Sequence, residues 1–149
     1  MKNLEVFLRQ FELPDLQEVL KIERLSFAID PWPASRFKYY AQHQSEGFIV
    51  AEINEKVTGY VVSGITDKKG KIASIAVDSK YRREGVGQQL AAYILNYFKK
   101  EEIKQVQVEV RTNNECSIRF FQSFHFEIVE TLKKYYPDGA DAYLMELSL

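Results

Sequence analysis

The chain has 149 residues, a formal net charge of −1 at pH 7, a hydrophobic share of 46% and a charged share of 28%. This length allows a sizeable buried core, so we expect a single domain over residues 1–149. The near-neutral charge argues against nucleic acid as a partner, and no apolar run is long enough to make a membrane a partner.

Cysteine and histidine are scarce, which bears on the compartment and on metal binding. Cys116 is the only cysteine of the sequence and cannot form an internal disulfide, which suits a reducing compartment. The first five residues lack the apolar stretch of a signal peptide, so we expect a cytoplasmic protein. The two histidines lie far from Cys116, and this spacing predicts no metal site. Cys116 is interpreted as a small helix residue, not as a nucleophile, because no histidine is near it in sequence.

The first third of the chain is predicted to form one strand and two helices. Alternating apolar residues predict the strand over residues 4–10. The first helix is predicted over 15–27, with a stripe at helical spacing made of Leu16, Val19, Leu20 and Glu23. Two prolines exclude a helix over 29–33, so that segment must be irregular, and the second helix follows over 34–44.

The rest of the chain is predicted to alternate strands with two more helices. The remaining strands are expected over 48–53, 57–65, 71–77, 105–110, 127–134 and 142–147, with turns at 54–56, 68–70 and 137–139. One helix carries the apolar stripe Val86, Leu90, Ala91, Ile94, Leu95 and Phe98. The other is capped by Asn113-Asn114 and ends near Phe124. The order β-α-α-β-β-β-α-β-α-β-β predicts a mixed α/β fold, a largely antiparallel central sheet flanked by helices.

A loop with two glycines joins the strand that ends at Val77 to the next helix. Backbone N–H groups at a helix start are unpaired, and the helix dipole favours an anion there. Gly85 and Gly87 have no Cβ, so a bulky phosphate can approach the backbone. Arg82 and Arg83 add fixed charge and forked donors. The segment therefore predicts a pyrophosphate cradle.

Two common phosphate-binding loops do not fit this segment. The nucleoside triphosphatase loop needs Gly-Lys-Ser/Thr, whereas Gln88 and Gln89 follow Gly87. The dinucleotide fingerprint needs a third glycine where Leu90 stands. The remaining pattern, Arg82-x-x-Gly85-x-Gly87 after Ile-Ala-Val-Asp, resembles the acyl-CoA loop of the GCN5-related N-acetyltransferase superfamily, Gln/Arg-x-x-Gly-x-Gly/Ala. The predicted order of elements is also similar to that of this superfamily, which implies its fold.

Further segments resemble one branch of that superfamily, the RimI-type and archaeal N-terminal acetyltransferases. They are Phe27 to Trp32, Val108-Glu109-Val110-Arg111 with Asn114, Tyr135-Tyr136-Pro137-Asp138-Gly139, and Asp141-Ala142-Tyr143-Leu144-Met145. The resemblance implies an enzyme that uses acetyl-CoA as co-substrate. It also implies that the acetyl group passes to a protein or peptide N-terminal α-amine, such as that of a ribosomal protein, by direct attack in a ternary complex.

The same resemblance implies where the coenzyme lies. The pantetheine arm is expected to pair with backbone groups of Ile75, Ala76 and Val77, where the superfamily's strand splays from its neighbour. The pyrophosphate is expected at Arg82, Arg83, Glu84, Gly85, Val86, Gly87 and Gln88. The backbone N–H of Val77 is the candidate oxyanion donor to the thioester carbonyl. Asn114 either reaches the pantetheine arm by its amide or only caps a helix.

Glu109 matches the position of the branch's catalytic glutamate. Attack on a thioester needs a neutral amine. An α-amine, with a pKa of about 8, loses its proton more easily than a lysine, with a pKa of about 10.4. We expect Glu109 to act as general base, through a water. The alternative is a strand glutamate that faces solvent or pairs with Arg111.

Two positions depart from the family pattern. Phe121 stands where the family usually has a tyrosine that protonates the coenzyme sulfur, and His125 replaces a usual glycine. Three accounts remain open. The thiolate leaves unprotonated, another hydroxyl such as that of Tyr136 or a water supplies the proton, or the protein has kept the fold without the activity. His125 as a replacement acid is the weaker interpretation beside a structural one.

The acceptor is expected to meet aromatic walls. Phe27, Trp32, Tyr135 and Tyr136 are the candidate substrate-binding residues, with core filling as the alternative for Trp32 and Tyr135. Two other functions stay open at this point: acetyl transfer to a small amine or a lysine side chain, and a non-catalytic acyl-CoA-binding module.

Overall fold

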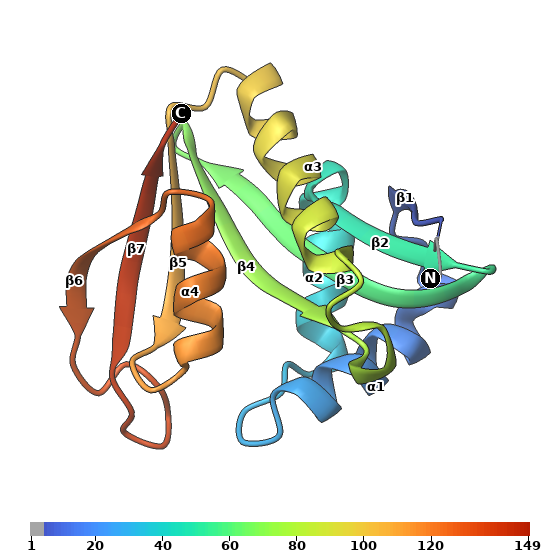
Figure 1. The fold of residues 1–149 in the computed structure, drawn as a ribbon, viewed down its shortest axis with the longest axis horizontal. Coiled ribbons are helices and arrows are strands. Elements are labelled where there is room, and N and C mark those ends of the chain that lie inside the picture. The colour runs from blue at the N-terminus through green and yellow to red at the C-terminus, as the bar shows by residue number, and fades with distance from the viewer. Residues whose placement is uncertain (1–4) are drawn as a thin grey trace. The chain divides into compact units, whose positions relative to one another are not determined.

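The structure is a computed structural model that describes residues 5–149. Figure 1 shows its elements. The strands are β1 Phe7–Gln10, β2 Phe48–Ile53, β3 Lys56–Thr66, β4 Lys69–Val77, β5 Gln105–Arg111, β6 Glu127–Leu132 and β7 Ala142–Ser148. The helices are α1 Leu16–Ser26, α2 Ala34–His43, α3 Val86–Lys100 and α4 Glu115–Ser123. Short 3₁₀ turns lie at Leu13–Asp15, Ser45–Gly47 and Ser79–Tyr81.

The element order confirms the predicted mixed α/β class. The strand order is β1-β2-β3-β4-β5-β7-β6. The pairs β1–β2, β2–β3, β5–β7 and β6–β7 are antiparallel, whereas β4 and β5 are parallel. The described chain forms two compact units, residues 5–64 with 74–97 and residues 65–73 with 98–149. That the chain is one domain stays a prediction. None of the helices within residues 5–149 is both long and apolar enough to cross a membrane.

Several predicted boundaries were wrong by a few residues. The first strand begins at Phe7, and residue 4, where we expected it to start, lies outside the described residues. The turn expected at 68–70 is formed by Asp67 and Lys68, whose φ angles are 52° and 63°. A two-residue hairpin turn of type I′ has positive φ at both central positions. Because the turn is that short, Gly70 lies in β4, where a Cβ would come within 2.9 Å of the ring of Phe98.

In the first unit, helices cover both faces of the sheet. A Cβ on Gly59 of β3 would lie 3.1 Å from the Ala76 carbonyl oxygen and 3.2 Å from a methyl of Val86, so α3 packs closely at this glycine. The next residue, Tyr60, contacts Glu23 of α1. Successive strand residues point to opposite faces, so α1 and α3 cover opposite faces of this sheet. The packing at Gly59 places the start of α3 beside the end of β4 (Figure 1).

An ion-pair cluster joins β1, β2 and the entry to α1 in the same unit. The guanidinium of Arg9 forms two hydrogen bonds of 2.8 Å to the carboxylate of Asp15 and also donates to Glu52. The backbone N–H of Glu12 donates to Asp15 at 2.8 Å. The hydrogen bond from Arg9 is the main cause that holds the pKa of Asp15 below its usual range.

Asp15→Asn is therefore expected to lower the free energy of unfolding at pH 7 by about 2 kcal/mol, because hydrogen bonds to a charged group are lost. The native pKa of Asp15 is depressed, so its stabilisation is present above the unfolded pKa and is lost as pH falls through the native pKa. Urea unfolding at neutral and at acid pH should show the gap between variant and wild type closing in acid. Glu46→Gln, at an exposed carboxylate, is the control; an equal gap at both pH values would contradict the expectation.

In the second unit, β5 places alternate side chains on two faces. Val106, Val108 and Val110 are buried. Glu109 and its alternate neighbours point the other way and are half-buried. The strand β5 pairs with β7 along its whole length, with Glu109 opposite Leu144. This antiparallel ladder fixes the direction in which the Glu109 carboxylate points.

Candidate active site

The predicted phosphate loop lies between β4 and α3, within the first unit. Arg82 donates from Nε to the carbonyl oxygen of Val77 at 3.3 Å, which holds the loop against the strand end. Gly85 has a φ of 81°, in the left-handed region that glycine adopts without strain. The N–H of Gln89 bonds to the Gly85 carbonyl at 3.1 Å, so α3 starts directly after this glycine. The helix's first N–H groups, which have no acceptor in the preceding turn, therefore follow the loop at once.

Charge and access at this loop suit an anion. Arg82, Arg83 and Glu84 are exposed, and Gly87 is half-buried in the first turn of α3. A Cβ built on Gly85 would meet nothing within 4 Å. The space beside the backbone is therefore open to a ligand, and two exposed arginines, Arg82 and Arg83, precede Gly85 in the loop.

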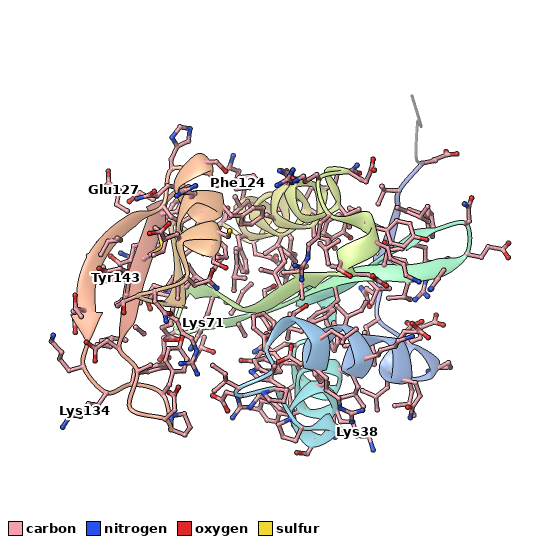
Figure 2. All side chains as sticks on the ribbon, turned by 60° about the horizontal axis from the view of Figure 1, so that its bottom comes forward. Lys38, Lys71, Phe124, Glu127, Lys134 and Tyr143 are labelled. Carbon is pink, nitrogen blue, oxygen red and sulfur yellow. The ribbon has the colours of Figure 1, made fainter. Side chains whose placement is uncertain are left out.

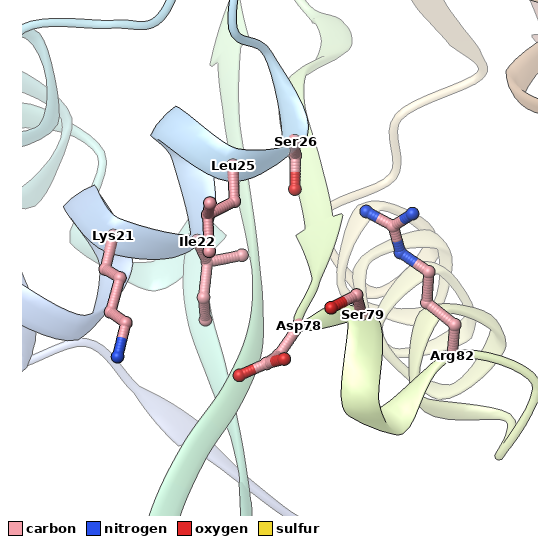
Figure 3. A pocket seen from close by; sticks show the side chains of 7 residues that line it. All are labelled: Lys21, Ile22, Leu25, Ser26, Asp78, Ser79 and Arg82. Carbon is pink, nitrogen blue, oxygen red and sulfur yellow. The ribbon is translucent and has the colours of Figure 1, made fainter.

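A hollow of about 180 Å³ borders the loop on the side of α1. Figure 3 shows its lining, with the guanidinium of Arg82 directed toward the end of α1, where Ser26 lies. The lining residues are Lys21, Ile22, Leu25, Ser26, Asp78, Ser79 and Arg82. The hollow combines two cationic side chains with one carboxylate, so it continues the positive character of the loop toward α1.

The irregular segment predicted over 29–33 is confirmed between α1 and α2, also in the first unit. Phe27 and Trp32 are both half-buried. The ring of Trp32 stacks on Tyr40 at 5.5 Å between centroids and lies 5.1 Å from Phe37. Trp32 thus packs on α2, which supports its core-filling interpretation. Because Trp32 is only half-buried, part of its side chain stays exposed.

Glu23 is a buried carboxylate to which the sequence prediction gave no role. It is only 1% exposed. It accepts hydrogen bonds from the Tyr60 hydroxyl, from the Trp32 N–H at 2.9 Å and from the Ser74 hydroxyl at 3.2 Å. Burial raises the pKa of Glu23, and these hydrogen bonds oppose the rise. The available signal was a carboxylate on the apolar stripe of the first helix.

Glu109, the predicted base, is paired with a lysine in the second unit. Its Oε1 lies 2.7 Å from Nζ of Lys71, which Figure 2 labels, and the Glu109 side chain is 17% exposed. The expected alternative, a pair with Arg111, is not what the structure shows. Arg111 bonds to Asp138 at 3.0 Å. The carboxylate is thus fixed in place while part of it stays accessible to water.

The tyrosine segment of the second unit is ordered by a network around Arg111. Its guanidinium lies 4.1 Å above the ring of Tyr136 and reaches Asp138 in the following turn. Gly139, with a φ of 87°, donates to the Tyr136 carbonyl at 2.8 Å. Tyr135 lies edge-on to Tyr136 and is 46% exposed. The backbone bond to Ala140, and then Arg111, hold the pKa of Asp138 below its usual range.

Asn114 and Phe121 lie at the two ends of α4. The side chain of Asn114 accepts from the Ser117 N–H at 3.2 Å, so the predicted helix cap is present. Its reach to a pantetheine arm stays a prediction. Phe121 is 3% exposed and packs against Phe126 at 5.4 Å. Cys116, earlier in the same helix, is exposed.

His125 follows the end of α4, in a left-handed position that glycine adopts without strain. Its φ is 74°, and its N–H bonds to the Gln122 carbonyl at 2.9 Å while Phe126 bonds to Phe121 at 3.1 Å. This pair of bonds is the Schellman motif, which places a left-handed residue after the helix. The position of His125 therefore supports the structural interpretation over an acid role.

His125→Gly is expected to raise the free energy of unfolding by about 1 kcal/mol, because the left-handed conformation strains any residue with a Cβ. Turnover should stay near that of the wild type. His125→Ala keeps the Cβ and is the matched control: it should give no gain. A loss of turnover in both variants would return His125 to the list of candidate acids. Thermal unfolding and thiol release measure the two effects.

A sheet strand that leads through an arginine- and glycine-containing loop into a helix, within this mixed α/β order, is typical of acyl-CoA-dependent N-acetyltransferases. The chain belongs to the acetyltransferase (GNAT) family, whose model matches residues 15–126. The family, the fold and the acetyltransferase class that the sequence predicted are thereby confirmed.

Individual relatives match over nearly their whole length. An N-alpha-acetyltransferase of Sulfurisphaera tokodaii is 32% identical over 161 residues, covering 99% of this chain and 96% of the relative. The [ribosomal protein bS18]-alanine N-acetyltransferase of Escherichia coli K12 is 28% identical over 143 residues, covering 93% and 94%. The structure of Arabidopsis thaliana Naa50 in complex with the bisubstrate analogue CoA-Ac-MVNAL has a TM-score of 0.85 at 25% identity, covering 97% and 99%.

Proposed function

We propose that this acetyltransferase moves the acetyl group of acetyl-CoA to the α-amine of a protein or peptide N-terminus, in the cytoplasm. The observation that carries the proposal is the open loop of Arg82, Arg83 and the left-handed Gly85 before α3, in a chain that resembles an N-alpha-acetyltransferase over 99% of its length. The loop supplies the coenzyme side of the reaction, and the relatives' activities indicate the acceptor.

The pyrophosphate of the coenzyme is proposed to lie at the start of α3. Arg82 and Arg83 are exposed there, and the left-handed Gly85 leaves open space beside the backbone. The first N–H groups of α3, from Val86 to Gln88, would donate to the phosphate oxygens. The pantetheine arm would run along Ile75, Ala76 and Val77, and the N–H of Val77 would donate to the thioester oxygen as negative charge develops on it.

The transfer itself needs a base and a leaving group. In the proposed step, the amine nitrogen attacks the thioester carbonyl carbon while Glu109 takes an amine proton through a water molecule. The carbon–sulfur bond then breaks, and the coenzyme leaves as a thiolate. Phe121 has no proton to give. A thiol with a pKa of about 8.5 is an acceptable leaving group. The thiolate then takes its proton from solvent or from a hydroxyl such as that of Tyr136.

The acceptor is proposed to be an extended peptide end held by aromatic side chains. Tyr135 is 46% exposed, and the ring of Tyr136 is fixed under Arg111. Phe27 and Trp32 are half-buried at the irregular segment between α1 and α2. Rigid aromatic rings supply contact area at small cost in conformational entropy. An alanine N-terminus, as in the name of the Escherichia coli relative, is one acceptor to include in any test.

The test is acetyl-CoA turnover, measured as free thiol, against short peptides that differ only in their first residues. An α-N-blocked lysine peptide, spermidine and each peptide's N-acetylated form accompany them. Turnover confined to free N-termini would support the proposal and show its sequence preference. Thiol release with lysine or spermidine alone would move the function to those amines. Coenzyme binding without turnover on any acceptor would favour a non-catalytic binding module.

A further inference from the structure

A carboxylate fills a core position where an apolar side chain would be cheaper to bury. Glu23 shares the inner face of α1 with Leu16, Val19 and Leu20 and is 1% exposed. Acidic residues are almost never fully buried without partners, because the charged form loses its water. The carboxylate therefore needs hydrogen-bond donors in the core.

Three hydrogen-bond donors from separate parts of the first unit converge on this carboxylate. Oε1 accepts from the hydroxyls of Tyr60, on β3, and Ser74, on β4. Oε2 accepts from the backbone N–H of Trp32, at 2.9 Å. A carboxylate has acceptor capacity on both oxygens and no donor of its own, so it suits a site where every neighbour donates.

The bond from Trp32 differs from the other two because it ends on an irregular segment. We define the acceptor loop as residues 27–33, which join α1 to α2. At its start, Phe27 bonds to the Glu23 carbonyl at 2.8 Å, and near its end the Trp32 N–H bonds to the Glu23 side chain. The first of these is the last backbone bond of α1, whereas the second depends on the Glu23 carboxylate. Between them, Ile29 is 73% exposed.

We propose that Glu23 is a positioning residue whose buried carboxylate fixes the acceptor loop in the shape that binds the peptide N-terminus. The inference rests on the proposed function, in which Phe27 and Trp32 contact the acceptor. Glu23 touches neither substrate nor coenzyme in this account; it acts through the backbone of Trp32. Its loss should weaken peptide binding more than it slows the chemical step.

Replacements of similar length show whether the hydrogen bonds of the Glu23 carboxylate matter or only its size. Glu23→Met keeps the length and removes every acceptor, so the Trp32 N–H loses its partner. Glu23→Gln keeps one carbonyl oxygen, which can face Trp32 while the amide donates to the two hydroxyls, since hydroxyls also accept. Tyr60→Phe is the matched control: it removes a bond to the same carboxylate and leaves the bond to Trp32.

The experiment uses the full-length protein and reads two signals. KM and kcat are measured for the best peptide of the panel, and the emission of Trp32, the single tryptophan of the sequence, reports on the loop without any substrate. Glu23→Met should raise the peptide KM about tenfold or more with a smaller change in kcat, because a hydrogen bond to a charged group is lost. Its tryptophan emission should shift. Glu23→Gln should restore most of both signals, and Tyr60→Phe should change stability alone.

Equal KM values and equal emission in Glu23→Met and Tyr60→Phe would overturn the proposal, because both changes would then act only on stability. If Glu23→Met does not fold, Glu23→Asp replaces it: the shorter side chain cannot reach Trp32 and the hydroxyls together, and the same two shifts are expected. Should no peptide be a substrate of the wild type, the proposed function fails, and the emission of the same variants still decides whether Glu23 fixes the loop.

Discussion

Glu109→Gln is expected to lower kcat by about 100-fold or more while the dissociation constant of CoA changes less than about twofold. The amide has the same size as the carboxylate but cannot take a proton from the attacking amine. The carboxylate is held by Lys71 at 2.7 Å and is 17% exposed, so it is fixed and still reachable by water. Steady-state thiol release and CoA titration measure the two quantities.

Glu146→Gln is the matched control for the base. Glu146 lies on β7, the strand paired with β5, and accepts a hydrogen bond of 2.6 Å from Gln107. Its replacement alters a carboxylate of the same sheet without removing the proposed base, so kcat should stay within a few-fold of the wild type. An unchanged kcat in Glu109→Gln, or equal losses in both variants, would exclude Glu109 as the general base.

Gly85→Val is expected to weaken acetyl-CoA binding by about tenfold or more. Valine is strained at the φ of 81° that this position adopts, so the loop must change conformation. A side chain here would also enter the space that the pyrophosphate is proposed to occupy. In the protein alone, a Cβ at Gly85 meets nothing within 4 Å, so the loss would arise from the backbone and the coenzyme. Calorimetric titration with CoA gives the dissociation constant.

Gly139→Val separates backbone strain from coenzyme binding. Gly139 has a φ of 87° and open space at its Cβ, as Gly85 does, but it lies in the turn between β6 and β7. The variant should lose about as much stability as Gly85→Val loses. Its affinity for CoA should equal that of the wild type. Wild-type affinity in Gly85→Val would contradict the proposed place of the pyrophosphate.

The features that could be predicted from the sequence are the local ones. The loop from Arg82 to Gln88 is contiguous, and its place between β4 and α3 follows from residues a few positions apart. That it binds a phosphate stays a prediction. The alternation of residues 105–111 likewise places the valines on one face of β5 and Glu109 on the other. Such patterns carry their own geometry, so the elements they form were predicted with small boundary errors.

The features that could not be predicted depend on long-range contacts. The carboxylate of Glu23 meets Tyr60 and Ser74, which are 37 and 51 residues away. The partner of Glu109 is Lys71, supplied by a strand that pairs with β5 in parallel near Gln107. No local pattern predicts such a pair. Arg111, which the sequence offered only as an alternative partner of Glu109, binds Asp138 instead.

The central claim is that the acceptor nitrogen is an N-terminal α-amine. One peptide tests it most directly: a short sequence with a free N-terminus and an internal lysine, incubated with acetyl-CoA and the full-length protein, then fragmented in a tandem mass spectrometer. The account predicts a single acetyl group on the first residue's α-amine. An acetyl group on the lysine side chain, with the N-terminus left free, would contradict it.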